Sequence, residues 1–463
     1  MAALLRLEAA LFMKDRALQL ALVVLAALLV ATVFTGAISE EEQRTAFLQA
    51  SERIHFEWQN QPPRNPHGAA HHGLFVYRGQ APLSSIESGV LSHQGAALFL
   101  EAHKRNQPYL SPAALRLTPA GLSTDKLLPL LHIAGGLAAL VIGLLLGSRD
   151  QRRRTLPMLA SVDSRQGRLV AQTIFVVSLV VVGGSVAILL SFFEVGPGAA
   201  SFRLILTTGL SILHLGVLAA CGVVGGAAMG SRPGGIAVIA LLWGLGAIAA
   251  PRLLGLIAES LIPTTQIGYE TQLEADLETV MNAHGESDLN EVFKNRVLKE
   301  YGVDSVDDLP VNFDALLMQE EEYQRAPVYE ARLGELARRA RAQDAIRALS
   351  WLLSPTPAML EVSARLSGAH FEAQLAFDRA AEAYRLEVVE ELNQHMAEHS
   401  RTGDWDWIPD DDYYGSFKPF SPPAPDLWAD IRAAAIPASA IVLWLLAAVV
   451  ALNFASRRPG WVR

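Results

Sequence analysis

The sequence has little of the chemistry that enzymes use. It contains one cysteine, Cys221, inside an apolar run, which excludes an intrachain disulfide and a cysteine-based metal site. It has no G-x-x-x-x-G-K-[ST] phosphate loop, no H-E-x-x-H zinc motif, and no G-x-S-x-G at a strand-to-helix turn. We therefore predict no catalytic residues, no intrinsic enzyme activity and no cofactor bound by this chain.

Charged side chains are also missing from the middle of the long apolar runs. Apolar residues make up 51% of the 463 residues. They gather in six runs near the roughly 20 residues that cross a bilayer, namely 17–37, 127–147, 169–193, 204–230, 234–250 and 433–455. Carriers coupled to ions normally need an ionisable group at this depth, so that class is disfavoured. Gln172 and Thr207 are polar residues within the runs, and His132 and His214 are expected to form interhelical hydrogen bonds.

The runs predict a mainly α, polytopic membrane protein with six transmembrane helices. Between them lie a small mixed extracytoplasmic insertion and a larger helical one. Five parts are expected. Residues 1–38 form an interfacial helix with the first span, 39–126 the first insertion, and 127–258 spans two to five with a coupling segment at 148–168. Residues 259–430 form the helical domain, and 431–463 the last span with a basic tail. A cleaved signal peptide is the rival interpretation of the start, but its apolar run is longer than a usual signal core.

Charge is distributed unevenly along the chain. The net charge is −9, yet residues 259–430 alone contain 34 Asp and Glu against 14 Lys and Arg. Basic residues gather instead near the start, in 148–168, at 231–233 and in the tail, which the positive-inside rule places in the cytoplasm. We expect a multi-pass protein of the bacterial inner membrane with both termini cytoplasmic and membrane lipids around it. Acidic outer parts argue against nucleic-acid binding.

Local patterns give a coarse secondary structure. Residues 2–16 are expected to form an amphipathic interfacial helix, 74–77 a strand and 94–106 a helix. In the large insertion we expect a helix over 315–353, a break at 354–357 with Thr356 as N-cap and Pro357 at the first helical position, and one further helix to about 399. Pro251 is expected to end the fifth span.

The segment 148–168 is a short basic stretch between the second and third spans. Arginines alone would make it a topogenic loop, which is the simpler explanation. Its apolar residues fall on one side of a short helix and its charges on the other, which is typical of a surface that receives a partner. We therefore select as candidate docking residues Asp150, Arg152, Arg153, Arg154, Thr155, Leu156, Leu159 and Arg168.

This segment resembles the coupling-helix region of permease subunits in type-2 exporters of the ATP-binding-cassette (ABC) class. That pattern has an acidic residue, Gly-Thr-Leu, a leucine pair and then a basic residue that opens the next span. Arg154 stands where the family usually has Gly. The matching positions are Asp150, Thr155, Leu156, Leu159 and Arg168.

Other stretches resemble one permease subfamily with two large extracytoplasmic insertions, the second a domain of unknown function. The similar stretches in the first insertion are Asn65-Pro66-His67, 70–75, Ala81-Pro82-Leu83 and 100–103; those in the second are 349–357 and 383–392. The resemblance implies an ATP-driven transporter subunit, an exporter or extruder, and does not identify the substrate.

If this chain is driven by ATP, the absence of a phosphate loop means that a separate cytoplasmic ABC ATPase must hold the ATP and Mg. A second permease subunit, identical or paralogous, and an envelope partner would complete the assembly. The alternative is a non-transporting scaffold or mechanotransmitter that passes ATPase-driven motion to an envelope partner.

Two further patterns remain open. Gly222, Gly226 and Gly230 recur every four residues in the fourth run, which permits close approach of another helix, either within this chain or at a permease dimer seam. Five of the twelve histidines lie within residues 67–103 of the first insertion, among them His67 and His71. Pro66 and nearby glycines disfavour a helix that would place these two on one face, so we expect structural hydrogen bonding and no metal ligands. A membrane-anchored metal-binding or sensory protein is the function that the histidines alone would support.

Overall fold

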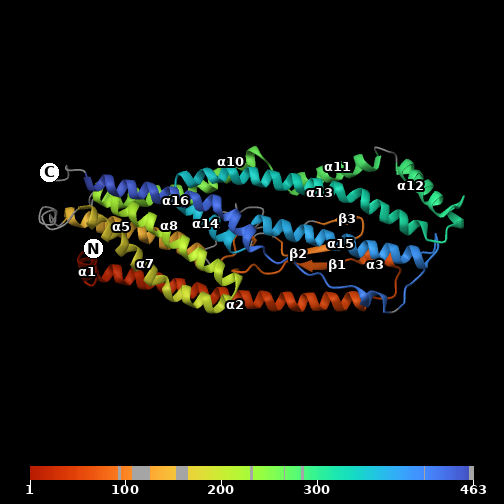
Figure 1. The fold of residues 1–463 in the computed structure, drawn as a ribbon, viewed down its shortest axis with the longest axis horizontal. Coiled ribbons are helices and arrows are strands. Elements are labelled where there is room, and N and C mark those ends of the chain that lie inside the picture. Colours follow the sequence, from red (N-terminus) through yellow and green to blue (C-terminus); the bar gives the residue numbers. More distant parts are fainter. Residues whose placement is uncertain are drawn as a thin grey trace.

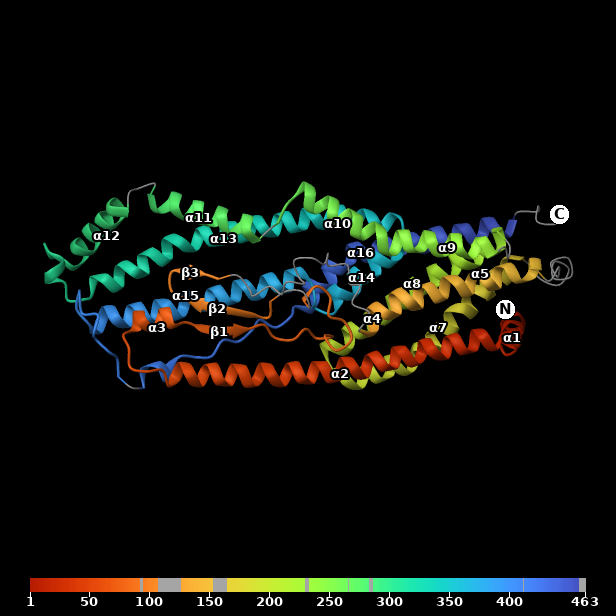
Figure 2. The same cartoon turned by 180° about the vertical axis from the view of Figure 1, so that it is seen from behind.

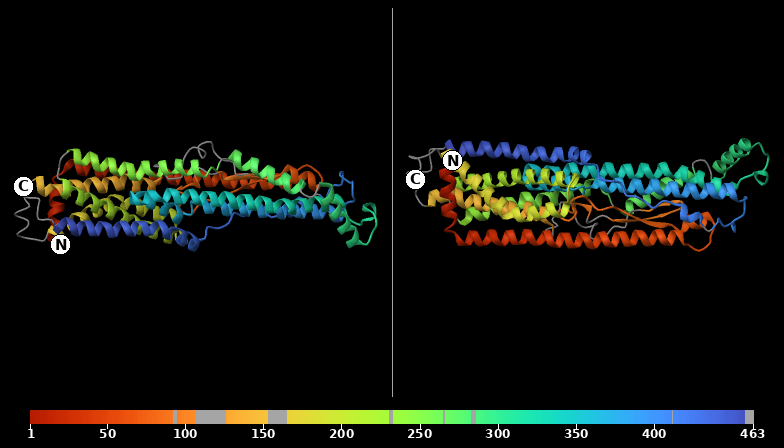
Figure 3. Two further views of the ribbon diagram at one scale, coloured as in Figure 1. Left: turned by 90° about the horizontal axis from the view of Figure 1, so that it is seen from above. Right: turned by 60° about the horizontal axis from the view of Figure 1, so that its bottom comes forward.

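The computed structural model describes residues 1–91, 95–106, 126–152, 165–229, 233–264, 266–282, 286–410 and 412–457. The molecule is elongated, with a bundle of apolar helices at one end and a long arm of polar helices at the other (Figures 1 and 3). We call the end of the bundle that carries α1 (Ala2–Phe12) the basal end, and the polar part the distal arm.

Within the described residues, six helices have the length and composition of membrane spans, as the sequence predicted. They cover Arg16–Gln59, Leu127–Arg149, Gln166–Val195, Ala199–Ala228, Gly234–Leu261 and Leu427–Arg457. They belong to α2 (Arg16–Gln59), to α4 (Leu127–Leu130) with α5 (Gly136–Arg152), to α7 (Arg165–Val195), to α8 (Ala199–Met229), to α9 (Pro233–Gly244) with α10 (Ala250–Leu261), and to α16 (Leu427–Arg457).

Helix α2 is far longer than expected. It has 44 residues, or about 66 Å at 1.5 Å per residue, which is twice the thickness of a hydrocarbon core. The first span was expected to end near residue 38. The helix continues because residues 38–59 are rich in Glu, Gln, Arg and Ala and contain neither Pro nor Gly. Its distal half runs along the arm beside the sheet (Figure 2).

The fifth span does not end at Pro251, as was expected. A π-helical turn, η3 (Leu245–Ala249), leads into α10, where Pro251 occupies the first turn. The π-helical turn just before it already interrupts the regular α-helical hydrogen bonds, to which a proline contributes no N–H. A second π-helical turn, η2 (Leu131–Gly135), separates α4 from α5.

The first insertion forms a short helix and a small antiparallel sheet of order β1-β2-β3. Helix α3 (Pro66–His72) precedes β1 (Leu74–Tyr77), which confirms the predicted strand. The helix predicted over 94–106 is wrong, because residues 97–106 include β2 (Ala97–Glu101) and β3 (Lys104–Arg105). Leu98 and Leu100 alternate inward and pack on α15 (Phe371–His399). The alternation of two suits a strand.

The distal arm consists mostly of α11 (Gln266–Asn282), α12 (Glu286–Tyr301), α13 (Phe313–Arg347) and α15, with one turn of 3-10 helix, η4 (Val306–Asp308), before α13 and another, η6 (Tyr413–Ser416), after α15. Helix α13 with the 3-10 turn η5 (Ala348–Leu352) confirms the helix predicted over 315–353. The chain then forms α14 (Pro355–Leu366), whose N-cap is Ser354 instead of Thr356. The single helix predicted to reach residue 399 is interrupted at 367–370, where Gly368 adopts φ +76°.

Helix α14 does not lie in the distal arm. It packs against α8, α16, α4 and both π-helical turns at the distal end of the bundle. Ala358, Met359 and Val362 are fully buried there. The connection between α13 and α15 therefore inserts into the bundle of spans, which the sequence analysis did not anticipate.

Candidate functional site

A buried charge cluster joins three helices at the basal end of the bundle. Glu8 of α1 is fully buried, and its Oε2 lies 3.1 Å from Arg149 Nη1 of α5. Its Oε1 lies 3.3 Å from Arg168 Nη2 of α7. Gln172 Nε2, one turn further along α7, donates to Glu8 Oε1 at 3.4 Å and to the Leu146 carbonyl at 3.2 Å. We call these four side chains, Glu8, Arg149, Arg168 and Gln172, the basal cluster.

The electrostatics of the basal cluster follow from helix direction. Arg149 lies in the last turn of α5, where the partial negative charge of the helix end favours a cation. Arg168 lies in the first turn of α7, where the same effect disfavours a cation. The Glu8 carboxylate, near that positive helix end, offsets the second cation. Both buried arginines thus have a charged partner, which buried ions require.

The basal cluster lies at the two ends of the predicted docking segment, 148–168, where Arg149 and Arg168 stand. Of the predicted docking residues, Arg168 is in the cluster. Asp150 and Arg152 belong to α5, but their side chains lie outside the described part of the structure. The remaining five, Arg153, Arg154, Thr155, Leu156 and Leu159, also lie outside the described residues. Docking at 148–168 therefore stays a prediction. Glu8 was missed, and the signal available was a lone acid in an otherwise apolar helical stretch.

Two glycines on α8 fit closely against α5. A Cβ on Gly222 would lie 2.1 Å from the Leu140 carbonyl oxygen, and one on Gly226 would lie 2.2 Å from that of Leu144. Gly143 and Gly147 of α5 face α8 in the same way. The face of α8 that carries Gly222 and Gly226 is therefore occupied by this chain's own α5, while Gly230 lies outside the described residues. Such contacts let two backbones pack as one rigid unit.

Hydrogen bonds between buried side chains join α8 to helix α14 and to the π-helical turn η2. His214 Nε2 of α8 lies 3.1 Å from Thr356 Oγ1 of α14. His132 Nε2 of η2 lies 2.8 Å from Ser211 Oγ of α8. The two imidazole centroids are 5.7 Å apart. The predicted role of both histidines as interhelical hydrogen-bond partners is confirmed.

A second buried charge cluster holds the other end of α14. Arg203 of α8 donates to Asp430 Oδ2 of α16 at 2.5 Å and to the Leu366 carbonyl at 3.0 Å. His370 Nε2, just after α14, lies 2.7 Å from Asp430 Oδ1. We call Arg203, His370 and Asp430 the distal cluster. They were missed because Arg203 and Asp430 stand at span ends, where a charge is unremarkable in sequence, and His370 lies 60 residues from Asp430. Together they fasten α14 between α8 and α16.

The histidines of the first insertion are partly brought together. His67, His71 and His103 converge, whereas His72 points elsewhere on α3 and His93 lies outside the described residues. The expectation that Pro66 would prevent a helix is wrong. Proline is favoured in the first turn, and the Asn65 side chain caps the helix by accepting a hydrogen bond from Gly68 N at 2.6 Å.

One comparison with known proteins gives a match. Residues 268–413 match a family described as "Domain of unknown function (DUF3526)". The matched part extends from α11 to the start of η6 and includes α14 with Thr356. No curated protein and no solved structure matches the chain.

Proposed function

We propose that this chain is the membrane-spanning permease subunit of an ATP-driven transporter of the ABC type, of the type-2 exporter class, with its termini and the segment 148–168 in the cytoplasm of a bacterium. The observation that carries the proposal is the basal cluster. Glu8 connects α1 to both ends of this segment, through Arg149 and Arg168. A force applied to 148–168 by a docked ATPase would therefore reach α1, α5 and α7 together.

The packing above the basal cluster supports transmission of that force. Helix α5 is packed tightly on α8 through glycines, and α8 holds α14 through His214 and Arg203. Short connections join α14 to α13 and α15, so a tilt of α8 would move the distal arm. ATP and Mg would be bound by the partner, because the sequence has no phosphate loop of its own.

Co-purification with charge reversal tests this proposal. Tagged full-length protein from its native membrane should bring down one protein that contains a G-x-x-x-x-G-K-[ST] motif and hydrolyses ATP. Replacing Arg152, Arg153 and Arg154 by Glu should reduce the recovered ATPase at least tenfold. Lys14→Glu, an exposed basal cation outside the segment, is the matched control and should leave recovery unchanged. Absence of any ATPase, or equal recovery from the triple variant, contradicts the proposal.

A mechanotransmitter without transport is the second candidate, favoured by the burial of α14. Because Ala358, Met359 and Val362 are fully enclosed, α14 fills the distal end of the bundle where a substrate would leave. Reconstituted vesicles separate the two functions. ATP-dependent flux of a solute supports transport, whereas full ATPase stimulation without flux of any candidate supports a scaffold that moves an envelope partner.

A further inference from the structure

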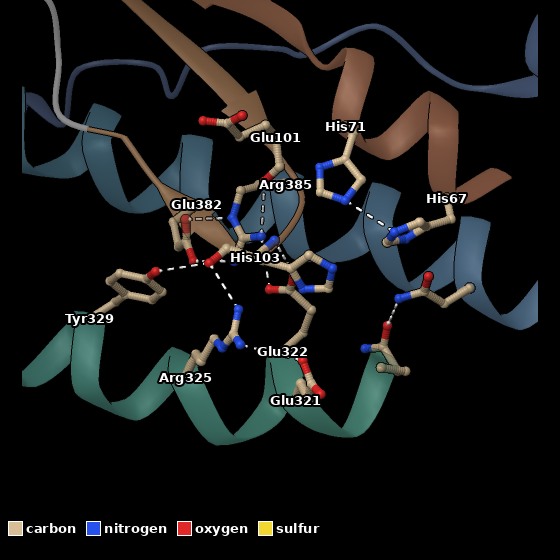
Figure 4. A network of polar contacts seen from close by, with 12 residues as sticks. His67, His71, Glu101, His103, Glu321, Glu322, Arg325, Tyr329, Glu382 and Arg385 are labelled. Atoms are coloured by element: carbon tan, nitrogen blue, oxygen red, sulfur yellow. Dashed lines mark hydrogen bonds and ion pairs between the residues drawn. The ribbon is translucent and has the colours of Figure 1, made fainter. Parts of the chain in front are cut away.

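Three imidazoles converge on one point of the distal arm, on the side of α13 that faces the small sheet (Figure 4). One ring nitrogen from each of His67, His71 and His103 lies within 4.8 Å of the other two. The Nε2 atoms of His67 and His71 are 3.0 Å apart. The His103 ring centroid lies 5.5 Å from that of His67 and 5.3 Å from that of His71. We call these residues the histidine triad.

The first two members are placed by a capped helix. His67 and His71 are four residues apart on α3, so their side chains leave the same face. The Asn65 cap fixes the start of this helix, and its amide nitrogen also donates to the Trp405 carbonyl at 2.5 Å. Gly73, with φ +64°, ends it. The pair is thus held in orientation before any ligand arrives.

The third member is held in an unusual backbone conformation. His103 lies in the turn between β2 and β3 with φ +60°, the only positive φ of a non-glycine residue in the described part of the chain. Such positions are strained and cluster at functional sites. The backbone N–H of Ala102 donates to the Ala70 carbonyl of α3 at 3.0 Å. This bond fixes the distance between His103 and the other two histidines.

Helix α13 fixes His103 from the opposite side. The backbone N–H of His103 donates to Glu322 Oε1 at 2.5 Å. Its carbonyl accepts from the Tyr329 hydroxyl at 3.1 Å and from Arg325 Nη1 at 3.3 Å. The strained turn is therefore determined by contacts with three side chains of one helix, all within the matched domain.

The Glu322 carboxylate also lies next to the imidazole of His103. Its Oε1 lies 3.3 Å from His103 Nδ1. The carboxylate is fully buried, and its Oε2 accepts from Arg385 Nη1 at 2.9 Å. Burial raises the pKa of Glu322, but the contacts with His103 and Arg385 outweigh it and lower this pKa to about 2. An ionised carboxylate behind a histidine is the arrangement that orients imidazole ligands in metal sites.

We propose that His67, His71 and His103 bind a divalent transition-metal ion, Zn²⁺ foremost, with Glu322 as the positioning carboxylate behind His103. Three imidazole nitrogens around Zn²⁺, each about 2.0–2.1 Å from the ion, leave a fourth position open to water or another ligand. In that geometry ligand nitrogens are about 3.3 Å apart, so small side-chain rotations close the triad around the ion. Imidazole-only donors suit Zn²⁺ and Cu²⁺ over Mg²⁺ or Ca²⁺.

The exposure of the triad agrees with this assignment. The triad remains partly exposed, with His71 the most accessible member, so an ion can enter from solution. A bound ion would fasten α3 to the His103 turn and, through Glu322, to α13.

Metal titration of the full-length protein tests the site. Protein purified in detergent and stripped with chelator should bind one equivalent of Zn²⁺, measured by competition with a chromophoric chelator and by elemental analysis. Cu²⁺ should compete for the same equivalent. His71→Ala and His103→Ala should each lose this equivalent, while Glu322→Gln should weaken affinity roughly 10–100-fold. Co²⁺ should give the visible spectrum of a tetrahedral nitrogen-ligated ion, and this spectrum should vanish in His71→Ala.

Two matched controls distinguish the triad from ordinary surface histidines. His72→Ala alters the neighbouring residue of the same helix, outside the triad. His395→Ala alters a second pair of histidines four residues apart, His395 and His399 of α15. Their rings are 4.2 Å apart, and no third histidine among the described residues joins them. Both controls should retain full binding. A wild-type protein that takes up neither Zn²⁺ nor Co²⁺, or controls that lose as much as His71→Ala, would overturn the proposal. Size-exclusion profiles and thermal unfolding establish that each variant is folded.

Discussion

The imidazole of His214 and the hydroxyl of Thr356 lie 3.1 Å apart, although 142 residues separate them in sequence. Both side chains are fully buried, so water cannot replace the hydrogen bond if one partner is lost. The contact links a span to the helix that connects the two long helices of the distal arm. It is one of the buried polar connections between the bundle and the arm, beside that of His370 with Asp430.

Thr356→Val removes this hydroxyl at nearly constant volume. We expect a loss of about 1 kcal/mol, the usual range for a hydrogen bond between membrane helices, because the His214 nitrogen is left buried without that partner. Thermal unfolding in detergent and amide exchange of α14 measure the effect, which should appear as faster exchange in α14. Thr356→Ser, which keeps the hydroxyl, serves as control. Equal exchange in both variants would show that the contact contributes nothing to holding α14.

Breaking the distal cluster should lower the stability of the protein more than Thr356→Val does. Asp430→Asn removes the negative charge beside Arg203, whose side chain is 1% exposed. Breaking a buried ion pair on one side costs about 3–5 kcal/mol, so we expect a clear drop in unfolding temperature. Replacing both residues together, Arg203→Met with Asp430→Leu, should recover most of it, since no charge is then left buried.

A surface pair provides the comparison for the distal cluster. Arg338 pairs with Glu335, and the Arg338 side chain is 69% exposed. Arg338→Ala should cost less than about 1 kcal/mol. If Asp430→Asn is as mild as Arg338→Ala, Arg203 is not dependent on Asp430 and the distal cluster does not fasten α14.

The membrane spans could be predicted from the sequence more completely than the elements of the distal arm. Spans could be predicted because a bilayer imposes length and composition on each helix separately. The extension of α2 could have been predicted as well, since residues 38–59 contain no helix breaker. Strand β2 was mistaken for a helix because its residues 97–100 form a short continuous apolar run, which fits a strand or a helix until the buried side chains are known.

The sites depend on contacts between distant residues, which one sequence does not reveal. His103 reaches α3 through a backbone hydrogen bond from Ala102 to Ala70, and nothing in the local pattern of either segment indicates it. Helix α14 has an apolar composition that would equally suit the core of a soluble helical domain. Its contacts with α8 and α16, among them that of Thr356 with His214, place it among the spans.

The glycines of α8 should be sensitive to small additions. Gly222→Ala and Gly226→Ala each place a Cβ within about 2 Å of an α5 carbonyl oxygen, so α5 and α8 must separate and the protein should unfold at lower temperature. Gly209→Ala is the matched control, because a Cβ there meets nothing within 4 Å. It should be neutral or stabilising by up to about 1 kcal/mol, as alanine favours a helix. A result in which Gly222→Ala matches Gly209→Ala would mean that α5 does not approach so closely.

Stability should depend on pH through Asp378 of α15. Burial raises the pKa of this carboxyl to about 6, against the partial effects of Gln374, Arg105 and Arg78. The folded state thus binds more protons than the unfolded state between the ordinary value of 3.8 and 6. Stability from this group is present below 3.8 and is lost as the pH rises through 6. Asp378→Asn keeps the side-chain oxygen that accepts from Gln374 and cannot ionise.

The unfolding temperatures of wild type and Asp378→Asn, compared from pH 4 to 8, measure this effect. The two should be similar at the acid end, and the variant should gain relative to wild type until about pH 6, then keep a constant advantage. An exposed aspartate, Asp404, serves as control, since Asp404→Asn should show no such divergence. An advantage of Asp378→Asn that does not vary with pH would show that the carboxyl is not protonated in the folded protein.

The basal cluster makes the sharpest connection between structure and the proposed function. Glu8→Gln removes the negative charge that lies within 3.3 Å of both Arg149 and Arg168 while keeping the size of the side chain. The two buried cations, Arg149 of α5 and Arg168 of α7, then repel each other, so the two ends of 148–168 should separate. We expect the spans to fold but the recovered ATPase to be stimulated several-fold less by this chain.

Adding Arg168→Gln to Glu8→Gln removes one of the two cations and should restore part of the stimulation. Glu41→Gln, on the exposed surface of α2, should change nothing. Normal stimulation by Glu8→Gln would mean that the docking segment acts without α1, and the force would then have to enter through α5 and α7 alone.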